Sequence, residues 1–130
     1  MSTNTNIPET LKYTAEHEWI DIKGDEALIG ITDFAQSSLG DVVYVEVPDS
    51  GKNIKAHDPF GVVESIKSVS DLYAPVSGVI IAKNTEVEQK PELLNQDSYK
   101  NWLIKIKITN PSELTALLSA ADYKKQVAGK

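Results

Sequence analysis

The residues with the clearest chemical potential surround Lys67, in the stretch from Gly61 to Gly78. Apolar strand-forming residues flank a short group of small and polar residues there, which predicts a β-hairpin with Lys67 at or beside its tip. No Asn-Gly or Asp-Gly pair marks the turn, so the sequence leaves its exact position open. A lysine at such a tip presents its amine on a tightly held ribbon, within reach of a modifying enzyme.

Two carboxylates, Glu64 and Asp71, flank this lysine in the sequence. Paired carboxylates can perform acid–base chemistry, although on a solvent-facing hairpin they are more often simply solvated. A catalytic lysine needs its pKa lowered by burial or by a neighbouring cation, and acidic neighbours favour the charged amine instead. The pattern therefore argues against a Schiff-base enzyme, and composition alone does not distinguish Lys67 from an ordinary solubility residue.

The composition narrows the function classes. The chain has 130 residues, 41% of them hydrophobic, which is the size of one domain with its own core. Its 13 basic residues are all lysines and its net charge is −6, a balance that argues against nucleic-acid binding. An acidic surface can steer basic partners, or it can serve solubility alone. The chain has no cysteine, and His17 and His57 do not have the spacing of a zinc site, so a metal centre is not expected.

The N-terminal residues lack a basic cluster followed by an apolar stretch, so no secretory or transit segment is evident. This favours a cytoplasmic location, although a processed organellar protein would show the same pattern. No feature marks an oligomer interface, and a monomer is the expected state.

The elements that must position the hairpin are mainly strands. We expect residues 1–10 to be a flexible lead-in, residues 11–123 to form one domain and residues 124–130 to be frayed. Alternating or continuous apolar runs predict further strands at 19–22, 27–31, 41–47, 79–82 and 102–108. In the last of these, Trp102, Ile104, Ile106 and Ile108 would share one buried face.

Two helices are predicted. The first is a short helix near 33–39, where Thr32 or Asp33 can cap the start and Gly40 can end it. The second is a C-terminal helix near 111–121, opened by Asn110 and Pro111, with an apolar stripe that would cover the β domain.

Similar segments follow Gly40 and Gly78, each with an apolar strand, a polar turn, an isolated aliphatic residue and a proline. Such a repeat favours a β-sandwich of two pseudo-twofold halves with the joining hairpin exposed at one end.

Several motifs resemble one family. Glu64-Ser65-Ile66-Lys67-Ser68, followed by Ala74-Pro75-Val76-Ser77-Gly78, is similar to the attachment hairpin of lipoyl and biotinyl carrier domains, and most similar to that of the glycine cleavage system H protein. Four further segments match that family in order: Tyr13-Thr14 with Glu16-His17-Glu18-Trp19, Gly30 to Gln36 with Leu39-Gly40-Asp41, Val45-Glu46-Val47-Pro48, and Pro91-Glu92-Leu93 with Asn95. The resemblance covers roughly residues 11–123.

The resemblance implies a mainly β, lipoyl-domain-like barrel-sandwich hybrid of two small antiparallel sheets. It also implies lipoic acid in amide linkage on Lys67. As a lipoyl carrier, the protein would receive an aminomethyl group from glycine decarboxylase and pass it to aminomethyltransferase. Dihydrolipoyl dehydrogenase would reoxidise the arm and lipoyl-attaching enzymes would load it, while the chain itself would catalyse no step.

The family uses acidic residues near the hairpin to hold the cationic amine of the loaded arm, and Glu18 and Asp71 are the positions that the resemblance indicates. Both are equally well explained as ordinary surface acids. One residue departs from the family pattern, because Asn101 stands where a glycine usually precedes the tryptophan of the last strand. Asparagine also tolerates a positive φ, so the departure concerns the local loop rather than the carrier role.

Two other functions remain open. The first is an H-like protein that mainly relays lipoyl or octanoyl groups to other lipoyl domains, and the second is an unmodified interaction domain that has kept the fold. The lack of cysteine agrees with a carrier, because a nearby thiol could attack a lipoyl disulfide, but it also has a bland explanation in chance.

Overall fold

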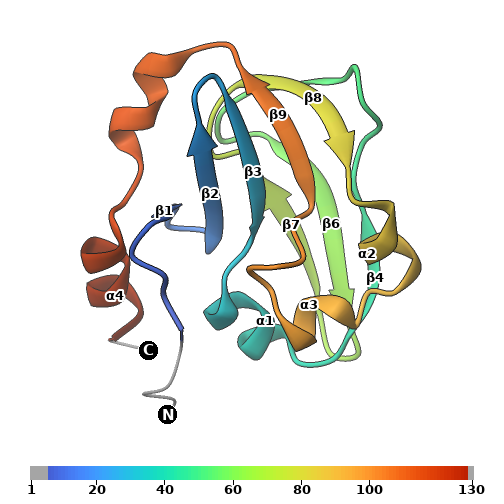
Figure 1. Cartoon of the computed structure of the whole chain (residues 1–130). Coiled ribbons are helices and arrows are strands. Elements are labelled where there is room, and N and C mark those ends of the chain that lie inside the picture. The colour runs from blue at the N-terminus through green and yellow to red at the C-terminus, as the bar shows by residue number, and fades with distance from the viewer. Residues whose placement is uncertain (1–5, 129–130) are drawn as a thin grey trace.

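The computed structural model describes residues 6–128, and two antiparallel sheets form its framework (Figure 1). The larger sheet has the strand order β1-β2-β3-β9-β8-β5 and the smaller sheet has the order β4-β6-β7. The larger sheet contains β1 (Lys12–Tyr13), β2 (Glu18–Lys23), β3 (Glu26–Ile31), β5 (Asn53–Ile54), β8 (Gly78–Lys83) and β9 (Ile104–Ile108). The smaller sheet contains β4 (Val42–Glu46), β6 (Pro59–Ser65) and β7 (Val69–Tyr73). The mainly β prediction is confirmed.

The main core lies between the two sheets, where alternate residues of each strand point inward. Ile104 and Ile106 on β9, Ile80 on β8 and Val63 on β6 are fully buried there. Since successive residues of a strand point to opposite faces, Ile20 of β2 enters this core while the neighbouring Trp19 packs into a second cluster with Tyr13 and Tyr123. Trp102, predicted to share a strand face with the isoleucines, precedes β9 and packs against this second cluster instead.

Helix α1 (Asp33–Leu39) is found where it was predicted. Thr32 caps it by accepting a hydrogen bond from the Ala35 backbone N–H at 3.1 Å. Gly40 ends the helix with a φ of 80°, a conformation that glycine adopts without a steric penalty. Two further short helices, α2 (Thr85–Gln89) and α3 (Leu93–Gln96), were not predicted.

The predicted single helix over 111–121 is wrong. The chain forms a 3₁₀ helix, η1 (Pro111–Ala116), then an extended residue at Leu117, and then α4 (Ala120–Ala128). The break lets Leu118 exchange two backbone hydrogen bonds with Tyr13, of 2.8 and 2.9 Å. The expected fraying of residues 124–130 is also wrong for 124–128, which are helical, while residues 129 and 130 lie outside the described part.

Part of the expected N-terminal lead-in, residues 1–5, lies outside the described residues, but residues 6–8 pack against the domain. Ile7 is buried in the second cluster, and the carbonyls of Asn6 and Pro8 accept hydrogen bonds from the hydroxyls of Tyr99 and Tyr13. Within residues 6–128, no helix has the length and apolar character that crossing a membrane requires.

Candidate functional site

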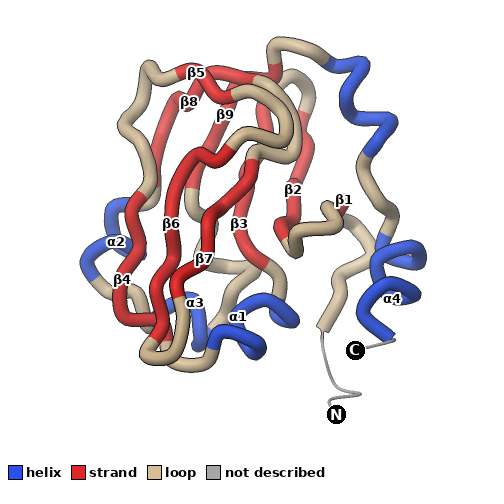
Figure 2. The backbone as a smooth tube through the Cα atoms, turned by 180° about the vertical axis from the view of Figure 1, so that it is seen from behind, coloured by secondary structure: helices blue, strands red, loops and turns tan. Residues whose placement is uncertain are grey.

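The hairpin tip that carries Lys67 joins β6 to β7 at one end of the small sheet (Figure 2). The Ser65 backbone N–H donates to the Ser68 carbonyl at 2.8 Å, which closes the turn. The Ser65 hydroxyl oxygen accepts from the backbone N–H groups of Lys67 and Ser68 at 3.3 and 3.1 Å. Two serines thus fix a turn that has no Asn-Gly or Asp-Gly signal, and this leaves the Lys67 residue exposed.

The residues that follow helix α1 contact the hairpin tip. The Ile66 backbone N–H donates to the Asp41 carbonyl at 3.1 Å. A Cβ atom placed on Gly40 would lie 3.5 Å from Cε of Lys67, so the lysine stem passes over this glycine rather than standing wholly clear of the surface. Asn95 of α3 secures the same corner, because its side chain accepts from the Val42 N–H at 2.9 Å and donates to the Gly40 carbonyl at 2.8 Å.

Beside the tip lies a cavity of about 250 Å³. It lies between the free edge of β7, the start of β2 and helix α1, and Val63 of β6 and Ile31 of β3 complete its lining, so its walls come from segments that are distant in sequence. Leu39, Val63 and Leu72 supply apolar walls, while Glu18 and Asp71 are both among the lining residues. The cavity therefore brings the two sequence-predicted acids to the side of the hairpin that carries Lys67.

Glu18 is buried in the cavity wall, with only 2% of its surface exposed. One carboxylate oxygen accepts from the Thr14 hydroxyl at 2.6 Å and the other from the Tyr73 backbone N–H at 3.2 Å. Burial raises the pKa of Glu18 to about 7; the two hydrogen bonds oppose this shift and the nearby charge of Glu16 adds to it. A carboxylate has about four acceptor positions, so Glu18 retains capacity for a further donor.

Asp71 occupies a different environment. It is exposed, and its neighbour Leu72 is buried, so strand alternation directs the Asp71 side chain to the solvent face of the small sheet. Its cross-strand partner is Val62, on the same solvent-facing row. The sequence could not separate the two acids, whereas the structure places Glu18 inside the wall and Asp71 at the rim.

Sequence reasoning did not identify Glu16 and His17 as cavity residues. His17 adopts a positive φ of 72°, and its Nδ1 lies 2.8 Å from the hydroxyl of Tyr123 on α4. No period in the sequence reveals this arrangement, because it depends on docking a helix more than a hundred residues away. In the sequence, Glu16 and His17 are marked as candidate site residues only by the segment Glu16-His17-Glu18-Trp19, which resembles the family motif.

Asn101 does not take the left-handed conformation that its substitution for glycine suggested, since His17 and His57 are the non-glycine residues with positive φ within residues 6–128. Its side-chain amide instead donates to the carbonyls of Leu93 and Asp97 at 3.0 and 2.9 Å. Asn101 therefore holds the end of α3 by side-chain hydrogen bonds, which a glycine could not make.

Comparison with known proteins agrees with this geometry. The family model described as "Glycine cleavage H-protein" matches residues 11–130. The chain is 56% identical over 120 residues to the glycine cleavage system H protein of Carboxydothermus hydrogenoformans, covering 92% of each chain. It is 53% identical over 119 residues to that of Symbiobacterium thermophilum, covering 91% of this chain and 93% of the relative.

Among solved structures, the crystal structure of a glycine cleavage system H protein from Mycobacterium marinum superposes with a TM-score of 0.84 at 39% identity. The match covers 94% of this chain and 99% of that one. The fold is that of a domain of two antiparallel sheets with an exposed lysine at a hairpin tip. The chain belongs to the glycine cleavage H-protein family, which gives it a lipoyl carrier role in glycine cleavage.

Proposed function

We propose that Lys67 is the residue that carries the lipoyl group. The observation that supports this most directly is the position of Lys67 at an exposed hairpin tip whose backbone is fixed by Ser65 and Ser68 and whose side faces a cavity. Acylation of its Nζ by the lipoyl carboxyl group forms an amide and removes the positive charge. The family is a lipoyl carrier family, and residues that present a free amine beside an apolar-walled cavity fit such a group.

A lipoyl group held there would supply a disulfide that accepts the aminomethyl group of glycine and passes it on. The chain's own contribution is to hold and shield a cationic amine at the end of the arm. The Glu18 carboxylate offers a negative charge inside the wall, and Leu39, Val63 and Leu72 limit the access of water. Asp71 attracts the amine at the rim before it enters.

The partners that follow are glycine decarboxylase, aminomethyltransferase, dihydrolipoyl dehydrogenase and the enzymes that attach the lipoyl group. The chain itself performs no bond-breaking step in this proposal. Its role is to keep the tethered substrate at a high local concentration for each enzyme in turn.

Intact mass spectrometry of the protein purified from its own host, grown with lipoate, tests the proposal. We expect a mass increase that corresponds to one lipoyl group, mapped to Lys67 by peptide sequencing. Lys67→Arg should abolish the increase and stop glycine cleavage in cells, whereas the control Lys55→Arg, on an exposed turn outside the hairpin, should change neither. A native protein with only the unmodified mass would refute the proposal.

A further inference from the structure

Among residues 6–128, no helix covers the solvent face of the small sheet. In Figure 2 the strands β4, β6 and β7 lie toward the viewer, and no helix crosses them. The strand register defines two rows on this face. One row contains Tyr44, Glu64 and Val69, and the other contains Glu46, Val62 and Asp71. These six residues, together with Val43 and Ile66, are named the hairpin face.

The hairpin face includes three large aliphatic side chains that are mostly exposed. Ile66 is 72% exposed, Val69 67% and Val43 53%. The register shift between Val42 and Tyr44 accounts for Val43, because a bulge turns two consecutive residues outward. Exposed apolar side chains that gather in one place on a surface mark interaction sites more often than scattered ones do.

The charges on this face have a single sign. Glu46, Glu64 and Asp71 contribute carboxylates, and none of the three strands contains a lysine. The carboxylates also affect Tyr44. Its hydrogen bond to Glu46 raises the pKa of its hydroxyl, and the charges of Glu64 and Glu88 raise this pKa further.

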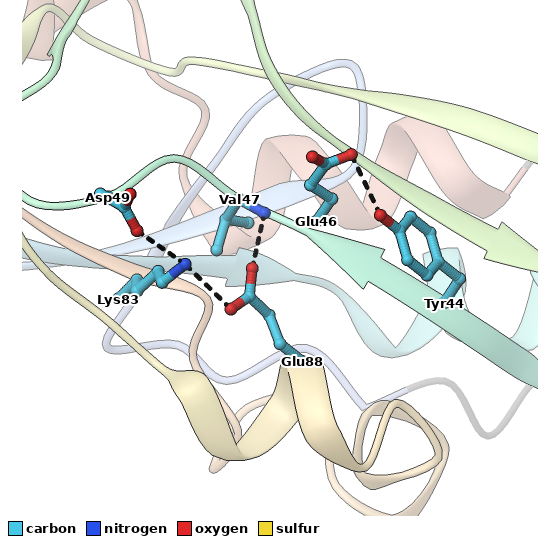
Figure 3. Close-up of polar contacts among 6 residues, drawn as sticks. All are labelled: Tyr44, Glu46, Val47, Asp49, Lys83 and Glu88. Carbon is cyan, nitrogen blue, oxygen red and sulfur yellow. Dashed lines mark hydrogen bonds and ion pairs between the residues drawn. The ribbon is translucent and has the colours of Figure 1, made fainter.

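Lys83, a cation near the end of β4, is already paired with two carboxylates. Lys83 lies between Asp49 and Glu88, with Nζ–O distances of 2.8 and 3.1 Å (Figure 3). Glu88 also accepts from the Val47 backbone N–H at 3.1 Å, so this ion group is tied to the end of β4. Apart from Lys67 at the tip, the side-chain charges of the hairpin face are therefore the carboxylates of Glu46, Glu64 and Asp71.

We propose that the hairpin face is the docking surface for the enzyme that acylates Lys67, and that this enzyme meets it with a basic surface around an apolar centre. The face is continuous with the tip, since Glu64 and Val69 are the paired residues closest to the turn. A protein that reaches Lys67 along the sheet must pass over these rows. The inference rests on the proposed function, because it takes Lys67 as the site of acylation.

Other occupants fit less well. A second copy of the chain would bring the same carboxylate rows together, and like charges in an interface repel. Nucleic acid would be repelled for the same reason. A basic protein surface satisfies both features of the face: its cations pair with the carboxylates and its apolar centre covers Val43, Ile66 and Val69.

The test uses a lipoate–protein ligase with lipoate and ATP, and follows lipoylation of the unmodified protein by mass at several salt concentrations. The variant Glu46→Lys/Glu64→Lys reverses the charge without touching the turn. Its matched control, Asp25→Lys/Asp122→Lys, makes the same change in net charge at exposed residues away from the small sheet. A neutral variant, Glu46→Gln/Glu64→Gln, removes the charges while keeping the side-chain shape.

We expect the charge-reversed variant to lower kcat/KM by about tenfold or more through KM, with kcat little changed, and to lose the salt dependence of the wild type. The neutral variant should show an intermediate loss, and the control should match the wild type. Equal kcat/KM values for all four proteins would overturn the docking proposal while leaving the carrier proposal intact. A wild type that is not lipoylated at all would instead overturn the proposed function.

Discussion

Glu18 is a buried carboxylate in the cavity wall. It is a charged residue type, yet it is 2% exposed and its two oxygens bind donors from separate segments. Burying a carboxylate disfavours its ionised form, which is why its pKa rises to about 7. Ionisation of Glu18 in the cavity wall therefore lowers the stability of the fold at neutral pH.

This cost predicts a pH dependence of stability. The folded protein binds the Glu18 proton more tightly than the unfolded chain does, so the contribution to stability is full below the unfolded pKa of 4.5 and is lost as pH rises through about 7. The loss amounts to about 3 kcal/mol in the free energy of unfolding. Urea denaturation between about pH 5 and about pH 8 should show this fall in the wild type and a flatter profile in Glu18→Gln.

The control is Asp25→Asn, an exposed acid that should keep the wild-type slope. Because glutamine changes the hydrogen bonds of the wall, the absolute stability of Glu18→Gln is not the readout. A slope identical to that of the wild type would show that Glu18 does not titrate in this range.

Gly30 lies directly against the indole ring of Trp19. A Cβ atom at this position would lie 2.6–2.7 Å from the indole of Trp19, whose Nε1 donates to the Ser98 carbonyl at 3.0 Å. Gly30→Ala should therefore lower the free energy of unfolding by about 1–3 kcal/mol. The double variant Trp19→Leu/Gly30→Ala should lose less stability than the sum of the two single variants, because the smaller side chain makes room for the methyl group. Additive losses, measured by thermal or urea denaturation, would contradict this account.

At the scale of elements, the sequence correctly predicted those helices and strands that are set by neighbouring residues. Helix α1 follows from Thr32 and Gly40, and the central hairpin follows from its apolar residues and the small residues between them. The prediction of a single C-terminal helix was wrong because Leu118 pairs with Tyr13 through backbone hydrogen bonds. This contact spans more than a hundred residues, and no local period in the sequence encodes it. The shape of the cavity was likewise beyond the sequence, because β2, α1 and β7 meet only after folding.

Helix α4 holds the start of β2 and of α1 together through Tyr123. Its hydroxyl lies 2.7 Å from Thr32 Oγ1 and 2.8 Å from His17 Nδ1, and its ring stacks on Tyr13 with centroids 4.8 Å apart. Burial raises the pKa of Tyr123, so the hydroxyl remains protonated and available as a donor. The C-terminal segment therefore supports both the capping residue of α1 and a residue of the cavity wall.

Tyr123→Phe removes this hydroxyl but keeps the ring. We expect the free energy of unfolding to fall by about 1–3 kcal/mol, since buried polar groups lose a partner. The matched control is Tyr44→Phe, whose hydroxyl lies on the exposed hairpin face and whose loss should stay within about 0.5 kcal/mol. Equal effects of the two substitutions, measured by urea denaturation, would mean that α4 contributes packing but no essential hydrogen bond.

At the scale of the whole molecule, the rigid and the accessible parts are separated. Strands β3, β9 and β8 are paired on both sides within the larger sheet, and their isoleucines fill the core. The tip of the smaller sheet, in contrast, exposes residues 66–71. If Lys67 carries the lipoyl group as proposed, this division keeps the attachment residue accessible to other enzymes while the larger sheet keeps its shape.

Native-state hydrogen exchange should reproduce this division. We expect the amides of β3, β8 and β9 to exchange slowest, near the rate set by global unfolding, and those of Lys67 and Val69 to exchange much faster. The Ser65 amide, which closes the turn, provides an internal control of intermediate protection. Uniform protection across the tip and the larger sheet would contradict the separation.

The raised pKa of Glu18 affects how a cationic group would bind in the cavity. Because burial raises its pKa to about 7, Glu18 is partly protonated at neutral pH. An ammonium group that settles against it would favour the ionised form and displace that proton into the surrounding buffer. The heat of cargo docking, measured by calorimetry, would then vary with the ionisation enthalpy of the buffer.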